Sequence, residues 1–199
     1  MSWSEFAGLL KTEVSGIGDG VYARYRGDAQ FSRVNRMTDQ VYNVLFLCKA
    51  NSTCSILAEA IMNKLGREHF RAFSAGIRPT RKVHPLALEE MRRSGLPTVA
   101  CRSKSWLEFA LPDARHMHFV FTVCDNVADE IRRIWPSQPI TGHWSIDDPG
   151  KVVGSEEEQR HAFSQIYTQL GNRIRLLLSL PLHKIERLAQ QTELAEAAA

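Results

Sequence analysis

The chain has 199 residues, of which 44% are hydrophobic and 24% are charged, and its net charge is +3. This composition excludes a membrane-spanning, collagenous, disordered or disulfide-scaffold protein, and no secretory signal is recognised, so we expect a cytoplasmic globular protein. The small net charge gives no indication of a nucleic acid or a membrane as a partner.

The amino-terminal part of the chain shows no regular hydrophobic period. Five of the twelve glycines fall among residues 1–36 and interrupt any strand or helix pattern. We therefore expect residues 1–40 to be a loosely attached extension, with Met37 as an alternative start. Residues 41–180 are expected to form the globular domain, and residues 181–199 a C-terminal helical tail.

From residue 41 onward, short apolar runs alternate with amphipathic helical patterns. The apolar runs, each bounded by polar residues, predict buried strands at 41–47, 70–74, 118–123 and 139–144. The helical patterns predict helices at 55–65, 85–94 and 126–135, and a long one behind a capping box of Ser155 and Glu158. Strands that alternate with helices predict an α/β fold with a parallel sheet covered on both faces.

The four cysteines are Cys48, Cys54, Cys101 and Cys124. No Cys-x-x-Cys pair occurs and the histidines show no ligand spacing, so we expect no metal site. A free cysteine is most often a small buried hydrophobe, and this is our expectation for Cys101. Cys48 differs because it stands where a buried strand ends and a loop begins.

The segment from Cys48 to Ser55 joins this strand to the following helix. Its short polar residues place several backbone N–H groups in one concavity, which binds an oxyanion with help from the helix dipole. The same field is expected to lower the pKa of the Cys48 thiol and make it a nucleophile. The alternative is that Cys48 only ends a buried strand. Asn51 suits a left-handed turn, and the Ser55 hydroxyl is expected to cap the helix and donate to Cys48. The predicted oxyanion-binding residues are Lys49, Ala50, Asn51, Ser52, Thr53, Cys54 and Ser55.

This segment resembles the phosphate-binding loop of the low-molecular-weight protein tyrosine phosphatase family, which includes the thiol-coupled arsenate reductases. The matching positions are Cys48, Asn51, Ser55, Ala58 and Glu59. Residues 73–76 resemble the Ser-Ala-Gly of the family's second strand, and residues 121–126 and 143–149 resemble the arsenate reductase branch. The resemblance covers residues 42–180. It implies a four-stranded parallel sheet flanked by helices, in the three-layer sandwich of phosphotyrosine protein phosphatase I.

One position departs from the family pattern. The family has an arginine six residues after the nucleophile, where this chain has Cys54. An arginine there binds two oxygens of the anion and stabilises transition-state charge, and a thiol does neither. The candidates for a replacement positive charge are Lys49, Arg78, Arg81 and Arg102. Cys54 is also close enough in the loop to form a disulfide with Cys48, which would block the nucleophile reversibly.

The resemblance also implies the other catalytic roles. Asp148, in the pair Asp148-Pro149, is the expected general acid, with Asp147 as its neighbour. Cys124 ends a strand as Cys48 does, and parallel sheets place their sites at this carboxyl edge. In the arsenate reductase branch a thiol at this position attacks the first one. The third cysteine of that branch has no counterpart in residues 130–136, which leaves a Cys48–Cys124 disulfide or an external thiol.

The leading hypothesis is an arsenate reductase with catalytic residues Cys48, Asp148 and Cys124. It needs no bound cofactor, and its partners are an arsenate or phosphate oxyanion and an external reductant such as thioredoxin, glutaredoxin or a small thiol. One alternative is a phosphatase that hydrolyses phosphate esters with Cys48 and Asp148. The other is a catalytically impaired module that binds an oxyanion or a phosphoprotein, because Cys54 replaces the arginine.

Overall fold

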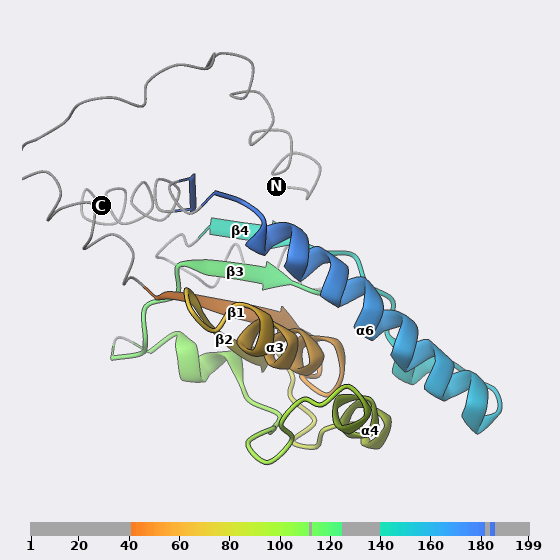
Figure 1. Ribbon diagram of the computed structural model, residues 1–199. Coiled ribbons are helices and arrows are strands. Elements are labelled where there is room, and N and C mark those ends of the chain that lie inside the picture. Colours follow the sequence, from red (N-terminus) through yellow and green to blue (C-terminus); the bar gives the residue numbers. More distant parts are fainter. Residues whose placement is uncertain (1–40, 112, 125–139, 182–183, 186–199) are drawn as a thin grey trace, which may run out of the picture.

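The computed structural model describes residues 41–111, 113–124, 140–181 and 184–185 (Figure 1). Its four strands are β1 (Tyr42–Cys48), β2 (Phe70–Gly76), β3 (Phe119–Thr122) and β4 (Ile140–His143). They form one parallel sheet in the order β2-β1-β3-β4, which confirms the expected four-stranded parallel sheet. The predicted extension 1–40, the predicted helix 126–135 and most of the predicted tail lie outside the described residues.

Within the described residues, three α-helices and two short 3-10 helices accompany the sheet. They are α3 (Cys54–Leu65), α4 (Pro85–Arg93), η1 (Trp106–Phe109), η2 (Pro149–Lys151) and α6 (Glu156–Leu178). Helices α3 and α6 pack against each other, and α4 packs beside α6 (Figure 1). None of the described helices combines the length and hydrophobicity that a bilayer crossing requires.

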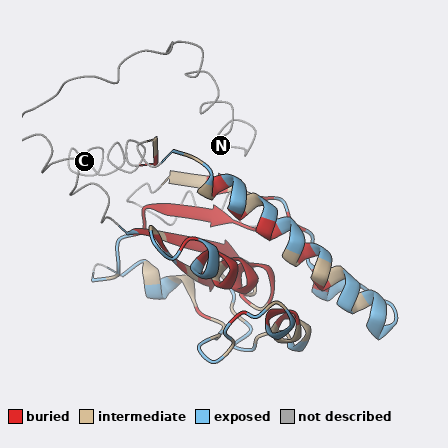
Figure 2. Cartoon of the chain, viewed as in Figure 1, coloured by how far each residue is buried: buried red, intermediate tan, exposed pale blue. Residues whose placement is uncertain are grey.

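The sheet separates two hydrophobic cores. Side chains alternate across a strand, so Phe46 and Cys48 of β1 face α3, whereas Leu45 and Leu47 face the opposite side. The first core is the larger, and the second is closed by residues that include Trp106 of η1. Figure 2 shows buried residues along β1 and β3 and on the inner sides of α3 and α6, whereas β4 is mostly of intermediate exposure. Burial on both faces explains why β1 and β3 read as largely apolar runs.

Helix α6 begins where the sequence predicts. The hydroxyl of Ser155 accepts from the backbone N–H of Glu158 at 3.3 Å, and the Glu158 carboxylate accepts from the backbone N–H of Ser155 at 2.7 Å. The two bonds form the expected capping box and satisfy two of the helix's first N–H groups. The helix then buries one apolar stripe against the first core. This stripe includes Phe163, Leu170 and Ile174.

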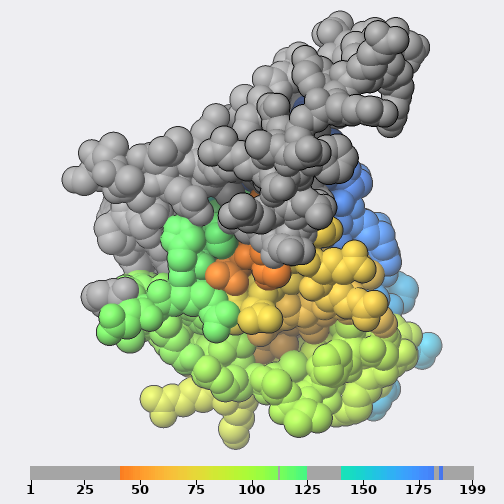
Figure 3. Space-filling view, turned by 60° about the vertical axis from the view of Figure 1, so that its left-hand side comes forward, coloured from red at the N-terminus to blue at the C-terminus, as the bar shows by residue number. Residues whose placement is uncertain are grey.

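A hydrogen bond near the start of β1 and a buried tryptophan after β4 fix the chain at these two strands. At the start of β1, the side-chain amide of Asn43 donates to the backbone carbonyl of His116 at 2.8 Å. The beginning of the described chain and the segment before β3 adjoin on the face shown in Figure 3. After β4, Trp144 is buried with its ring centroid 4.8 Å from that of Phe121 and 5.6 Å from that of Phe46. Trp144 therefore fixes the segment that carries Asp148 at the carboxyl edge of the sheet.

Candidate active site

The loop between β1 and α3 curls around the thiol of Cys48. The Sγ of Cys48 accepts from the backbone N–H of Asn51 at 3.0 Å and lies 2.9 Å from the Oγ of Ser55. Asn51 has φ +48°, the left-handed conformation that its residue type predicts. This conformation turns the backbone N–H of Asn51 inward, as oxyanion binding by a loop requires.

A buried polar network supports this loop from below. The side-chain amide of Asn51 donates to the hydroxyls of Ser55 and Ser74, at 2.9 Å each, and its carbonyl oxygen accepts from the backbone N–H of Lys104 at 2.5 Å. The Ser74 hydroxyl donates to the carboxylate of Glu59, which also accepts from the ammonium of Lys104 at 2.8 Å. Sequence reasoning gave no role to Lys104, because it lies far along the chain and matches no motif.

The end of β2 packs directly beneath the loop. A Cβ added to Gly76 would lie 2.9 Å from the backbone nitrogen of Asn51 and 2.9 Å from the carbonyl oxygen of Lys49. Just beyond Gly76, the backbone N–H of Arg78 donates to that same Lys49 carbonyl at 2.8 Å. A side chain at position 76 would displace the loop, which explains physically why a glycine stands there.

A cavity of about 160 Å³ opens above Cys48 at the carboxyl edge of the sheet. It is lined by Cys48, Lys49, Ala50, Ser52, Thr53, Cys54, Val123, Cys124, Ile146, Asp148 and Lys151. The structure therefore brings the predicted catalytic residues Cys48, Asp148 and Cys124 together. Of the predicted oxyanion-binding residues, Asn51 and Ser55 are fully buried beneath the loop and outside this lining.

The structure distinguishes the two neighbouring aspartates. Asp148 lines the cavity, and its Oδ1 accepts from the backbone N–H of Gly150 at 3.1 Å as the N-cap of η2. Asp147 is outside the lining and turns its backbone carbonyl toward the thiol of Cys54, with 3.8 Å between oxygen and sulfur. Of the two aspartates, Asp148 is thus the one whose residue reaches the cavity.

The expected pKa of Cys48 was wrong in direction. Burial raises the pKa of the Cys48 thiol above its ordinary value. The hydrogen bond with the Ser55 side chain and those with backbone groups of Asn51, Ala50 and Ser55 lower it, but burial is the larger effect. The physical reason is that the loss of hydration on burial outweighs these hydrogen bonds.

Cys54 is the first residue of α3, and its thiol is buried in the cavity wall. Burial raises the pKa of Cys54, and the negative forms of Cys48, Asp148 and Cys124 raise it further. The thiol is therefore neutral near pH 7 and supplies no charge to an anion. The expected helix cap was wrong, because the N-cap is Thr53, without a side-chain hydrogen bond. The expected contact between the Ser55 hydroxyl and Cys48 is present.

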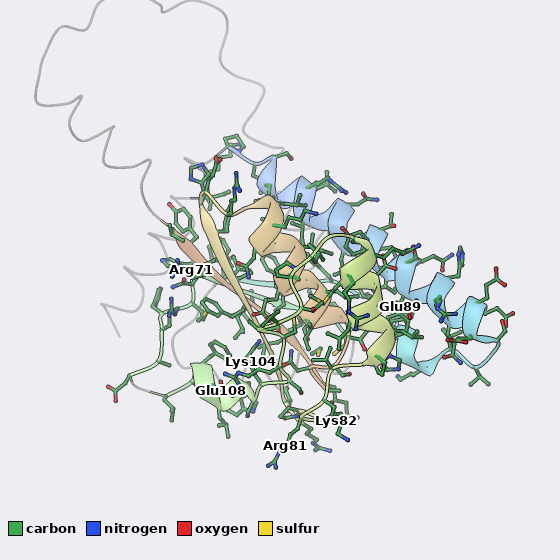
Figure 4. All side chains as sticks on the ribbon, turned by 60° about the horizontal axis from the view of Figure 1, so that its bottom comes forward. Arg71, Arg81, Lys82, Glu89, Lys104 and Glu108 are labelled. Carbon is green, nitrogen blue, oxygen red and sulfur yellow. The ribbon has the colours of Figure 1, made fainter. Side chains whose placement is uncertain are left out.

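The cations considered as replacements for the missing arginine differ in their placement. Lys49 lines the cavity, whereas Arg78 and Arg81 are outside its lining, and Figure 4 shows Arg81 at the outer end of its loop. Arg102 is paired with Glu108 at 2.5 Å.

A second lysine in the cavity wall, Lys151, was missed by sequence reasoning. Its one signal was its position three residues after Asp148, on the same short turn of η2.

Cys101 lies away from the cavity. It is half-buried, and its sulfur contacts the Met91 sulfur at 4.0 Å and the Pro97 carbonyl at 3.6 Å, so its surroundings are those of a packing residue. Within the described part of the chain, no group of three or more His, Cys, Asp or Glu side chains is arranged to hold a metal ion.

Comparison with known proteins agrees with this geometry. Residues 43–193 match the family model described as low molecular weight phosphotyrosine protein phosphatase. The arsenate reductase of Bacillus licheniformis is 32% identical over 133 residues, which cover 66% of this chain and 91% of that protein. The arsenate reductase of Oceanobacillus iheyensis is 31% identical over 133 residues, which cover 67% and 92%.

Solved structures show the same likeness. An arsenate reductase in the phosphate binding state superposes with a TM-score of 0.56 at 26% identity, covering 73% of this chain and 99% of that one. A tyrosine phosphatase of Erwinia amylovora has the same fold, with a TM-score of 0.56 at 20% identity over 68% of this chain and 90% of that one. Because the family model matches residues 43–193, most of its length, the chain belongs to the low molecular weight phosphotyrosine protein phosphatase family.

Proposed function

We propose that this protein is an arsenate reductase-like enzyme that converts arsenate to arsenite with Cys48 as its nucleophile. The observation that carries the proposal is that a thiol other than Cys48 lines the same cavity as Cys48 and Asp148. Ester hydrolysis needs only a nucleophile and an acid, whereas thiol-coupled reduction also needs a second sulfur within reach. The relatives named arsenate reductase support the same activity.

The first step forms a bond between sulfur and arsenic. The backbone N–H groups of the lining residues 49, 50 and 52–54 and the ammonium groups of Lys49 and Lys151 hold the oxyanion above Cys48. The Cys48 thiolate attacks arsenic, and Asp148 donates a proton to the oxygen that leaves as water. Because burial raises the pKa of Cys48, its proton must be lost on the way to this step.

The second step reduces arsenic. A second thiol attacks the Cys48 sulfur, the sulfur–arsenic bond breaks, and its electron pair stays on arsenic, which leaves as arsenite. The sequence assigns this thiol to Cys124, which lines the cavity. An external reductant of the thioredoxin, glutaredoxin or small-thiol class then reduces the disulfide, a chemistry that suits the reducing cytoplasm.

A direct assay tests the proposal with the full chain. Arsenate and excess dithiothreitol are added, and arsenite is separated and counted. We expect steady arsenite formation that Cys48→Ser abolishes and Cys101→Ser leaves unchanged, because Cys101 lies outside the cavity. Arsenite formation that is absent from the wild type, or that survives Cys48→Ser, contradicts the proposal.

The buried, uncharged thiol of Cys54 at the arginine position favours one competing function, an impaired module that binds an oxyanion without turning it over. Binding of sulfate or phosphate with neither arsenite formation nor hydrolysis of p-nitrophenyl phosphate identifies this module. Hydrolysis of p-nitrophenyl phosphate without a thiol reductant, in the absence of arsenite formation, identifies a phosphatase instead.

A further inference from the structure

We propose that Cys54 is the thiol that resolves the arsenic adduct on Cys48, so that the disulfide forms inside the oxyanion loop. The inference rests on the proposed function and names one of its steps. It gives a purpose to the residue that replaces the loop arginine, and it differs from the sequence-based assignment of this step to Cys124.

The closure of the loop places Cys54 beside Cys48. The hydroxyl of Ser55 touches the Cys48 sulfur at 2.9 Å, and Cys54 immediately precedes Ser55, at the usual Cα spacing of about 3.8 Å. Both sulfur-bearing side chains belong to the same buried core and line the same cavity of about 160 Å³. A disulfide needs Cα atoms within about 7 Å, and a loop already curled to this degree suits that requirement.

The register of the sheet places Cys124 less favourably. Leu47 of β1 is paired with Thr122 of β3, and the backbone N–H of Val123 donates to the Leu47 carbonyl at 2.8 Å. Position 123, not 124, is therefore level with Cys48. Because side chains alternate along a strand, Val123 shares the α3 side of the sheet with Cys48, while Cys124 packs at the border of both cores.

The charges around Cys54 agree with its position beside Cys48. After burial, the negative form of Cys48 raises the pKa of Cys54 most, ahead of Asp148 and Cys124. Cys54 thus stays protonated until a base removes its proton. Asp148 becomes a carboxylate when it protonates the departing oxygen, and it lines the same cavity as Cys54, so it is the base that we assign to this proton.

The chemistry balances with the two thiols alone. One arsenate and two thiols give one arsenite, one water and one disulfide. The Cys48–arsenic bond forms as water leaves. The Cys54 sulfur then loses its proton to Asp148 and bonds to the Cys48 sulfur, and the electron pair of the sulfur–arsenic bond reduces As(V) to As(III).

A single turnover of the full chain tests the assignment. The reduced protein receives one equivalent of arsenate without reductant, is quenched and alkylated in acid at early times, and is digested with trypsin. Lys49 lies between the two cysteines, so Cys48 is in peptide 37–49, Cys54 in peptide 50–64 and Cys124 in peptide 116–132. We expect arsenite together with a disulfide that joins peptides 37–49 and 50–64.

Two variants complete the test. Cys54→Ser keeps the size of the side chain and is expected to slow single-turnover arsenite release about 100-fold, whereas Cys101→Ser releases arsenite like the wild type. A first disulfide between peptides 37–49 and 116–132, or a loss of arsenite release in Cys124→Ser but not in Cys54→Ser, overturns the assignment and leaves the proposed function standing. Absence of arsenite from the wild type overturns both.

Discussion

The ammonium of Lys104 lies 2.8 Å from the carboxylate of Glu59, and the backbone N–H of the same lysine donates to the side chain of Asn51. One residue thus connects a largely buried ion pair to the loop that surrounds Cys48. The Lys104 side chain is 8% exposed and that of Glu59 is 23% exposed, so water replaces little of this contact if it is lost. Figure 4 shows Lys104 within the body of the protein.

Lys104→Met is therefore expected to destabilise the protein. It leaves the Glu59 carboxylate without its cation, which costs about 3 kcal/mol of the free energy of unfolding, measured by urea denaturation. Arg160→Met is the matched control, because it removes an exposed ion pair with Glu89 and is expected to cost less than about 1 kcal/mol. Equal urea midpoints for the two variants would show that the buried ion pair contributes no more to the free energy of unfolding than the exposed one.

Gly76→Ala tests the contact between β2 and the loop. The added Cβ meets backbone atoms of Asn51 and Lys49 at 2.9 Å, so the loop must move. We expect a stability loss of about 1–3 kcal/mol and weaker sulfate binding by calorimetry. In Gly171→Ala the added Cβ meets only the end of the flexible Arg175 side chain, at 3.3 Å, so sulfate affinity is expected to stay the same. Unchanged sulfate binding by Gly76→Ala contradicts this account of the loop.

Cys54→Arg restores the residue that the family places in the loop. An arginine adds a positive fork to the cavity, and we expect p-nitrophenyl phosphate hydrolysis without reductant to rise at least about 100-fold. The same change removes the thiol proposed to resolve the arsenic adduct, so single-turnover arsenite release is expected to fall. Unchanged hydrolysis would mean that another cation already fills the position of the missing arginine.

The raised pKa of Cys48 predicts how its reactivity depends on pH. A thiol below its pKa gains about tenfold in thiolate per pH unit, so alkylation of Cys48 by iodoacetamide should rise steadily from pH 6 to pH 9. Ser55→Ala removes the side-chain hydrogen bond that lowers this pKa, and its alkylation at pH 8 should be slower than in the wild type. Mass spectrometry of peptide 37–49 follows the modification. A rate that levels off below pH 7 would indicate a thiolate and contradict the effect of burial.

Lys151→Gln tests the cation that sequence reasoning missed. Lys151 lines the cavity but is exposed, so its attraction for an oxyanion is screened, and we expect its loss to weaken sulfate or arsenate binding about fivefold. Lys82→Gln is the control, since Lys82 is exposed and outside the cavity lining, on the loop seen in Figure 4. Equal affinities for the two variants, measured by calorimetry at low salt, would remove Lys151 from the binding site.

Local patterns in the sequence suffice for most of the fold. The apolar runs predict the four strands, and the Ser155–Glu158 pair predicts the start of α6, because both depend on neighbouring residues alone. The start of α3 was misplaced by this reasoning. The sequence allows the Ser55 hydroxyl both to cap the helix and to contact Cys48. Only the closed loop shows that the contact with Cys48 forms and the cap does not.

The sequence by itself determined which chemical groups the candidate site contains: a thiol at the end of a strand, an oxyanion loop, an Asp-Pro pair, and a cysteine where an arginine is expected. Only the tertiary structure decided that Asp148 faces the cavity, that Lys151 joins it and that Lys104 supports the loop from below. It also decided the direction of the pKa shift of Cys48. The physical reason is that burial and long-range contacts depend on how distant segments pack, and no local spacing of residues encodes them.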